Sequence, residues 1–382
     1  MYRDLVKNYN NIKANIQINF VQGAKVEILS PVDAEYFVEF INKKTGKIIH
    51  SSTIQNNCWT KCLYEYFIDW NIKVYQKEND KLTLLEDYHY NATNKRVYIA
   101  FDSKALGDTL AWISYVEEFR KKHNCKVICS TFLNELFEKQ YLEIEFIKPG
   151  DIAHNLYAMY TFGWSTKEDS TINSFKHPNN IRIQNLQELA TDILGLDFIE
   201  IRPKLAIPKV SKRKQVTIAI HSTAQAKYWN NPTGWQEVVD WCSEKGYEVV
   251  LLSREGDGYM NNMHPSGIKR LESYSIDNIV KELYKSEFFI GISSGLSWLA
   301  WATGIPTVLI SGFTDAITEP ASCYRIEAPE EICHGCWSKF KLDAGDWNWC
   351  PIYKGTDKQF ECSKLITGAQ VIEVLTSLMG KL

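Results

Sequence analysis

Buried strands alternate with amphipathic helices in two parts of the chain, and this alternation restricts the fold more than any other sequence feature. Strand–helix–strand units place parallel strands in one sheet with helices on its faces. The first series begins near residue 95 and the second near residue 215. The predicted strands are 95–101, 126–131, 215–222, 247–253, 287–294 and 306–312, and the predicted helices are 109–124, 233–246, 275–286 and 295–304. The fold class is therefore α/β, with two facing Rossmann-like domains.

The first 92 residues have a different pattern, in which apolar and polar residues alternate. Such alternation is typical of half-buried strands. It is found at 14–29, 34–53 and 59–77, and the segment NKKTGK at 42–47 predicts a hairpin turn. We expect an N-terminal all-β module, either a barrel or a sandwich.

The segment 199–214 is rich in proline and basic residues and predicts a linker between the two α/β domains. In open α/β sheets, ligands bind beyond the carboxyl ends of the strands, which places the site in the cleft between the domains. The predicted divisions are 1–92 for the β module, 93–210 and 211–330 for the Rossmann-like domains, 331–364 for a cysteine-rich segment and 365–382 for a C-terminal helix.

Composition excludes several classes of protein. The formal net charge of −3 gives no electrostatic footprint for nucleic acid. Every apolar run is shorter than the roughly 20 residues that a membrane span requires, and the first residues have no secretory pattern. These features favour a cytoplasmic protein, in which thiols stay reduced and clustered cysteines favour a metal over disulfides.

Three loops follow predicted strands and carry candidate site residues. The first contains Gly107 and Asp108, and Asp108 is a candidate base or simply a helix N-cap. The second contains Lys227, a candidate phosphate contact or a solvated surface lysine. The third, with Ser293, Ser294 and Gly295, leads into a helix whose N-terminus could bind an anion or merely be capped.

Four of the ten cysteines lie close together near the end of the chain. Their spacing is C-x2-C-x13-C-x11-C, from Cys333, Cys336, Cys350 and Cys362. Four thiolates can complete a tetrahedral site for zinc or iron, and a set of unrelated buried thiols is the alternative. The segment between them has few aliphatic residues, so we expect a bound metal to stabilise it in a structural role.

The motifs ALGDTLAW, HSTAQAKYW and SSGLSWLAWATGIPTVLISG resemble those of the heptosyltransferases, which are GT-B glycosyltransferases. Ser293 stands where that family usually has Asp, and Trp298 where it usually has His. Together with the N-terminal β module and the four cysteines, the whole chain resembles the bacterial autotransporter heptosyltransferases. Their C-terminal four-cysteine segment is an iron finger.

This resemblance implies an enzyme that transfers heptose from ADP-heptose to serine hydroxyls of an autotransporter adhesin passenger domain, with inversion. It also implies one structural iron per chain, with zinc as the second choice, and a homo-oligomer that forms a dodecameric ring. Asp108 would be the general base and Lys227 would stabilise the diphosphate. The donor contacts would be Gly107, Thr223, Lys227, Glu255 at the ribose, Ser293, Ser294, Gly295 and Leu296.

Two alternatives remain open on the sequence alone. One is a GT-B enzyme that uses another nucleotide sugar or another acceptor. The other is a metal-stapled binding module without catalysis. Because residues 1–92 contain no donor motif, we expect the β module to bind the acceptor or a neighbouring subunit.

Overall fold

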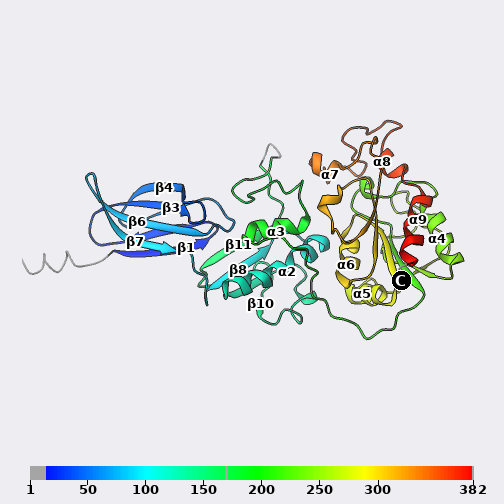
Figure 1. The fold of residues 1–382 in the computed structure, drawn as a ribbon, viewed down its shortest axis with the longest axis horizontal. Coiled ribbons are helices and arrows are strands. Elements are labelled where there is room, and N and C mark those ends of the chain that lie inside the picture. Colours follow the sequence, from blue (N-terminus) through cyan, green and yellow to red (C-terminus); the bar gives the residue numbers. More distant parts are fainter. Residues whose placement is uncertain (1–13, 168–170, 381–382) are drawn as a thin grey trace, which may run out of the picture.

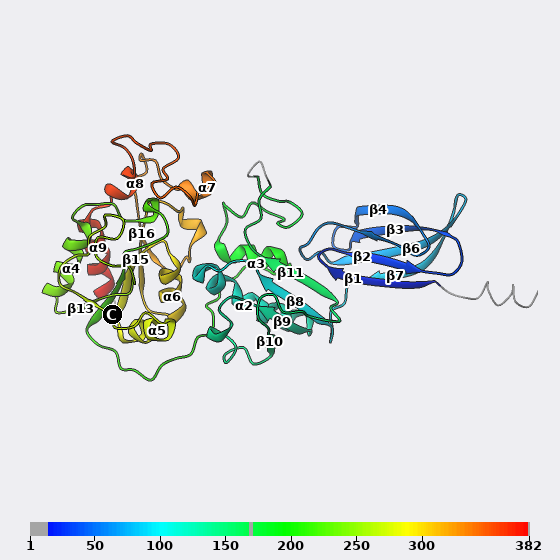
Figure 2. The same cartoon turned by 180° about the vertical axis from the view of Figure 1, so that it is seen from behind.

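The computed structural model describes residues 14–167 and 171–380. Three parts follow one another along the long axis of the molecule: the β module, the first α/β domain and the second α/β domain (Figure 1). The view from behind shows the same order (Figure 2). The two Rossmann-like domains and the all-β module that the sequence predicts are thus confirmed.

The β module consists of two antiparallel sheets whose apolar faces share one core. One sheet has the order β4-β3-β6-β7, and the other contains β1, β2 and β5. Asn42 pairs with Lys47, which confirms the predicted hairpin turn. The strands are β1 (Asn15–Val21), β2 (Lys25–Leu29), β3 (Glu35–Asn42), β4 (Lys47–Gln55), β5 (Cys58–Lys61), β6 (Trp70–Glu78) and β7 (Lys81–His89).

The module is not independent of the first α/β domain. Phe20 of β1 pairs in parallel with Ala158 of β11, so one seven-stranded sheet runs β10-β9-β8-β11-β1-β2-β5. The sequence does not show this continuity, because strand pairing between distant segments leaves no local pattern. The elements of this domain are β8 (Arg96–Phe101), α2 (Leu106–His123), β9 (Lys126–Ser130), η1 (Asn134–Leu136), β10 (Ile144–Phe146), β11 (Ala158–Phe162) and α3 (Leu186–Leu194).

The second α/β domain is a six-stranded parallel sheet in the order β14-β13-β12-β15-β16-β17. Residues 196–213, which connect it to the first domain, form neither helix nor strand, as predicted for a linker. Its elements are β12 (Gln215–Ala219), η2 (Gln225–Lys227), α4 (Gly234–Glu244), β13 (Glu248–Leu251), β14 (Ile268–Arg270), α5 (Ile276–Lys285), β15 (Phe288–Ile292), α6 (Gly295–Thr303), β16 (Thr307–Ser311), η3 (Ala316–Thr318) and β17 (Tyr324–Glu327).

The cysteine-rich segment contains two single-turn helices, α7 (Cys336–Lys339) and α8 (Glu361–Lys364), and α9 (Gly368–Met379) follows it. Thr367 and Gln370 form a capping box at the start of α9. Buried Val371, Leu375 and Leu378 join α9 to the core of the second domain. Both views place α7 at the side of that domain that faces the first domain (Figures 1 and 2).

Candidate active site

Asp108 lies in the first turn of α2, but it does not cap the helix. The N-cap is Ala105, so Asp108 is the third residue of the first turn. Its Oδ2 accepts hydrogen bonds from Ser103 Oγ at 2.6 Å and from Trp164 Nε1 at 2.9 Å. The carboxylate is therefore held by the loop after β8 and the loop after β11, at the carboxyl ends of two neighbouring strands.

Burial is the main influence on the acidity of this carboxyl group, and it raises the pKa of Asp108 above its ordinary value of 3.8. The hydrogen bonds from Ser103 and Trp164 and the charge of Lys227 oppose this rise because they favour the ionised form. An acid whose pKa moves toward neutrality is better matched to proton transfer near neutral pH. The direction of this shift fits the predicted role of Asp108 as a base.

Lys227 approaches Asp108 from the second domain. It ends η2, in the loop after β12, and its Nζ lies 3.4 Å from Thr223 Oγ1 and 5.4 Å from the centre of the Phe313 ring. Burial lowers the pKa of Lys227, and the charge of Asp108 opposes that effect. Since the charge of each group shifts the pKa of the other, the predicted base and the predicted phosphate contact lie near each other across the domain interface.

The first turns of α2 and α6 are in close contact, and glycines make this possible. A Cβ atom on Gly107 would lie 3.1 Å from Trp298 Cδ1, and one on Gly295 would lie 3.2 Å from the backbone nitrogen of Gly107. Trp298 is buried in this contact and packs edge-on against Trp301. The indole at position 298 thus fills the interface between the two helices.

The N-terminus of α6 has no side-chain cap. Ser294 is the N-cap residue, but its hydroxyl makes no capping bond, and Ser294 Oγ is a buried atom without a partner in the described part of the chain. Ser293 precedes it and Leu296 follows in the first turn. Backbone N–H groups at an uncapped helix start are available to an anion, and the helix dipole favours negative charge there.

Glu255 lies beside His221. It follows β13, and its Oε2 is 4.0 Å from His221 Nδ1. Its backbone oxygen accepts a hydrogen bond from Arg270. The structure therefore brings Gly107, Asp108, Lys227 and Gly295 together, with Thr223 beside Lys227, but holds Glu255 against His221.

Sequence reasoning missed the aromatic group around His221. This residue follows β12, and its ring contacts the rings of Tyr228, Tyr259 and His264 at 5.2–6.1 Å. Burial lowers the pKa of His221 to about 4, so the ring is neutral at neutral pH. Trp347 of the cysteine-rich segment covers Tyr228 and Tyr259. The position of His221 at a strand's carboxyl end was the available signal.

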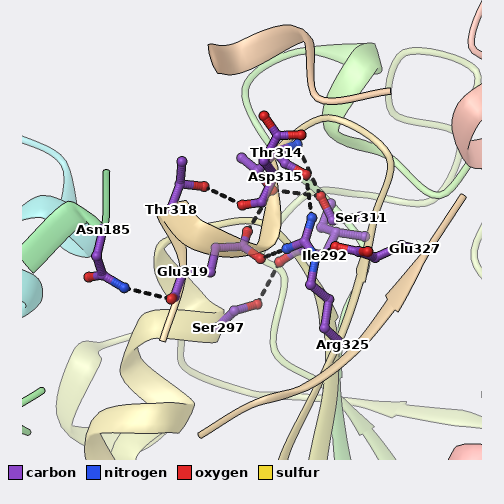
Figure 3. Close-up of polar contacts among 10 residues, drawn as sticks. All are labelled: Asn185, Ile292, Ser297, Ser311, Thr314, Asp315, Thr318, Glu319, Arg325 and Glu327. Atoms are coloured by element: carbon purple, nitrogen blue, oxygen red, sulfur yellow. Dashed lines mark hydrogen bonds and ion pairs between the residues drawn. The ribbon is translucent and has the colours of Figure 1, made fainter. Parts of the chain in front are cut away.

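The loop after β16 contacts the cysteine-rich segment through backbone hydrogen bonds from Gly335 and Trp337. Figure 3 shows the polar contacts of this loop, including the one with Asn185 of the first domain. In this loop, buried Glu319 accepts a hydrogen bond from Thr314 Oγ1 at 2.7 Å and forms an ion pair with Arg325. The backbone oxygen of Glu319 accepts a hydrogen bond from Asn185, the N-cap of α3 in the first domain. Phe313, whose ring contacts Lys227, belongs to the same loop. The polar network of the loop therefore holds the aromatic surface on which Lys227 lies.

The four cysteines of the cysteine-rich segment lie close together and pack against the loop after β16. Burial, together with the nearby Cys333, Cys362 and Cys350, raises the pKa of Cys336 to about 12. No group of three or more metal-ligating side chains meets the geometry of a metal site within residues 14–167 and 171–380. The chemistry of four adjacent thiols nevertheless fits a soft metal, since a cation would relieve the mutual repulsion of their thiolates.

The cysteine-rich segment also reaches the first domain. The Trp337 ring packs edge-on against Trp164, with ring centres 5.0 Å apart, and Trp164 is the indole that donates to Asp108. The backbone nitrogen of Trp337 donates to the Phe313 oxygen at 3.0 Å. Trp337 therefore contacts the support of the candidate base on one side and the loop under Lys227 on the other.

Comparisons with known proteins identify the family of the chain. The family model Glycosyltransferase family 9 (heptosyltransferase) matches residues 184–328. The autotransporter heptosyltransferase BAHTCr of Citrobacter rodentium is 38% identical over 379 residues, which cover 96% of this chain and 90% of that protein. The autotransporter heptosyltransferase Aah of Escherichia coli is 37% identical, with coverage of 94% and 92%.

A solved structure is similar over almost its whole length. It is the dodecameric iron-containing heptosyltransferase TibC in complex with ADP-D-beta-D-heptose. The TM-score is 0.86, the identity is 33%, and the match covers 96% of each chain. Both α/β domains, the N-terminal module and the cysteine-rich segment thus fall within the similar region.

Proposed function

The chain belongs to the autotransporter heptosyltransferase family, a group of GT-B glycosyltransferases, and we propose that it transfers heptose from ADP-heptose to serine hydroxyls of an autotransporter passenger domain, with inversion. The observation that carries this proposal is the meeting of Asp108 and Lys227, from opposite domains, beside the uncapped start of α6. A base, a cation and a helix N-terminus are the groups that this reaction requires.

The proposed reaction is a direct displacement at the anomeric carbon. The serine oxygen attacks that carbon, the bond to the diphosphate oxygen breaks, and the serine proton passes to Asp108. Attack from the face opposite the leaving group inverts the anomeric configuration. A serine hydroxyl is a weak nucleophile at neutral pH, and a general base typically contributes ~10²–10⁴-fold to such a step.

The leaving ADP gains negative charge as the glycosidic bond breaks. Lys227 and the first N–H groups of α6, near Ser294, Gly295 and Leu296, would stabilise that charge. Glu255, which lies beside His221, would contact the ribose of the donor nucleoside. No step in this account requires a metal at the reacting atoms.

The test is a transfer assay with purified protein, a co-purified passenger domain and three donors: ADP-heptose, ADP-glucose and UDP-glucose. Intact-mass spectrometry should show addition of heptose only with ADP-heptose, and peptide mapping should place it on serine. Transfer from UDP-glucose would favour the alternative sugar, and no transfer from any donor would favour a non-catalytic binding module. The anomeric proton coupling in the product's NMR spectrum tests inversion.

We further propose that Cys333, Cys336, Cys350 and Cys362 hold one structural iron per chain, a proposal that the similarity to the iron-containing glycosyltransferase TibC supports. When bound, the metal would connect the four cysteines and so hold together parts of the segment that are distant in the sequence. Elemental analysis of freshly purified protein should give one iron per chain, with zinc as the competing result. A metal-free protein with the same melting temperature would refute the structural role.

We propose that the β module serves assembly or acceptor binding, and that the protein forms a ring, since the similar protein TibC is dodecameric. Exposed Leu82 and Leu84 lie on β7, an edge strand of the four-stranded sheet. Deleting residues 1–92 would also remove β1 from the sheet of the first domain, so a point substitution is the cleaner test. Leu84→Asp should reduce the mass measured by light scattering or weaken passenger binding, whereas Leu142→Asp, an exposed leucine of the first domain, should change neither.

We place this reaction in the cytoplasm. None of the ten cysteines is in a disulfide, which fits a reducing compartment. In the described parts of the chain, no helix has both the length and the apolar character needed to cross a bilayer. Fractionation of cells that produce the tagged protein would test the assignment.

A further inference from the structure

A groove of about 800 Å³ lies between the first domain and the cysteine-rich segment. One wall is the loop between β11 and α3, which includes His177, Asn180 and Arg182. The other wall is α7 and the residues after it, which include Ser338 and Lys341. Both views show this loop and α7 near each other along the upper edge of the molecule, where the two α/β domains meet (Figures 1 and 2).

Two buried polar atoms in the lining have no partner in the described part of the chain. They are His177 Nδ1 and Ser338 Oγ, one from each wall. His177 is 3% exposed, and its Nε2 accepts a hydrogen bond from the backbone nitrogen of Ser165 at 3.2 Å. Burial lowers the pKa of His177 to about 4, so the ring is neutral and Nδ1 must carry the proton. A buried N–H donor without an acceptor is costly, which points to a ligand that supplies one.

The groove adjoins the candidate base. Ser165, which His177 holds, is next in the chain to Trp164, and Trp164 Nε1 donates to Asp108. Trp337, which packs on Trp164, is next to Ser338 of the opposite wall. The groove therefore lies beside the pair of indoles that supports the carboxylate, although neither indole lines it.

We propose that this groove binds the acceptor polypeptide as an extended segment that presents its serine to Asp108. This inference rests on the proposed function and adds the place where the acceptor docks. Backbone carbonyls of the segment would accept from His177 Nδ1–H and from the Ser338 hydroxyl. Arg182, Lys339 and Lys341 give the lining positive charge, so acidic or neutral residues around the serine would be favoured over basic ones.

The test measures peptide binding directly, so it does not depend on turnover. Three short fluorescent peptides, each with one central serine flanked by Gly-Asp, Gly-Asn or Gly-Lys, are titrated with the full-length protein in saturating ADP. The variants are Ser338→Ala, which removes a hydroxyl without a partner, and Lys341→Glu, which reverses an exposed charge. Lys358→Glu, an exposed lysine of the same segment that does not line the groove, is the matched control.

The Gly-Asp peptide should bind wild-type protein most tightly. Ser338→Ala should weaken its binding by about fivefold, the value of one hydrogen bond. Lys341→Glu should reverse the order of the acidic and basic peptides, and Lys358→Glu should leave it unchanged. ADP affinity should be the same in all four proteins. Equal peptide affinities in wild type and both groove variants would overturn the proposal. If wild-type protein binds peptide through the groove but transfers no sugar, the proposed function fails while this inference holds.

Discussion

Asp108→Asn separates the catalytic interpretation of this residue from a structural one, because the two predict different effects on stability. The substitution keeps the size and shape of the side chain but removes its capacity to accept a proton. Transfer should fall by ~10²–10⁴-fold, the usual contribution of a general base. The affinity for ADP should change little, since Asp108 contacts Ser103 and Trp164 within the first domain.

The sign of the stability change follows from the position of Asp108. The loss of an aspartate N-cap would lower the free energy of unfolding by about 0.5–2 kcal/mol, but the cap of α2 is Ala105. Burial raises the pKa of Asp108 above 3.8, so ionisation of this group costs folding free energy. Its contribution to stability is fully present below pH 3.8 and is lost as the pH rises through the folded pKa. At neutral pH the asparagine variant should be as stable as wild type or more stable.

The assay combines urea unfolding at neutral and acidic pH with steady-state transfer. Asp102→Asn is the matched control, because it changes an exposed carboxylate on the same loop and should affect neither quantity. A variant that is less stable by more than about 1 kcal/mol, with normal activity per folded molecule, would show that Asp108 acts in the fold and not in the reaction.

Four further predictions follow from the same contacts. Lys227→Ala should weaken ADP binding in calorimetry by about tenfold or more, since a charge-assisted contact to phosphate is lost; unchanged affinity would place the diphosphate elsewhere. Gly295→Ala should separate α2 from α6 and lower both stability and transfer, by about 1–3 kcal/mol in unfolding, whereas Gly256→Ala, whose Cβ meets nothing within 4 Å, should be silent. Cys350→Ser should reduce the iron content and the melting temperature together, and loss of one without the other would contradict a structural metal. Trp337→Ala should free the Trp164 indole, raise the pKa of the candidate base and move the acidic limb of the pH–rate profile to higher pH; an unmoved limb would refute the coupling.

Local periodicity was sufficient to predict most of the second domain. The four inner strands β13, β12, β15 and β16 and the helices α4, α5 and α6 agree with the sequence pattern, because each of these strands is a continuous apolar run and each helix has a clear start or stop. The edge strands β14 and β17 were not predicted, because they are short and carry charged residues. Ser275 caps α5, and Gly304 ends α6 in the left-handed conformation. Ser275 and Gly304 each lie next to the helix end that they determine, so the local sequence is enough to predict where these helices begin and end.

Features that depend on distant contacts were not predictable in this way. The pairing of β1 with β11 joins segments more than a hundred residues apart, and nothing near Phe20 indicates its partner Ala158. The ion pair of Glu319 with Arg325 and the hydrogen bond from Asn185 likewise depend on how the domains meet. For Asp108, the sequence predicted a residue at a helix start but not the two side chains that hold it.

The cysteine-rich segment is best understood as part of the site. Its Trp337 packs on the indole that donates to Asp108, and its Trp347 covers Tyr228 and Tyr259 near the loop of Lys227. A stretch that contains two single-turn helices and few aliphatic residues has little cohesion of its own, so the free energy of metal binding would stabilise these contacts as well. If the proposed metal is bound, it would hold the aromatic residues around the candidate base and the loop of Lys227 without touching either, and this would account for the occurrence of aromatic residues and cysteines together in this part of the chain.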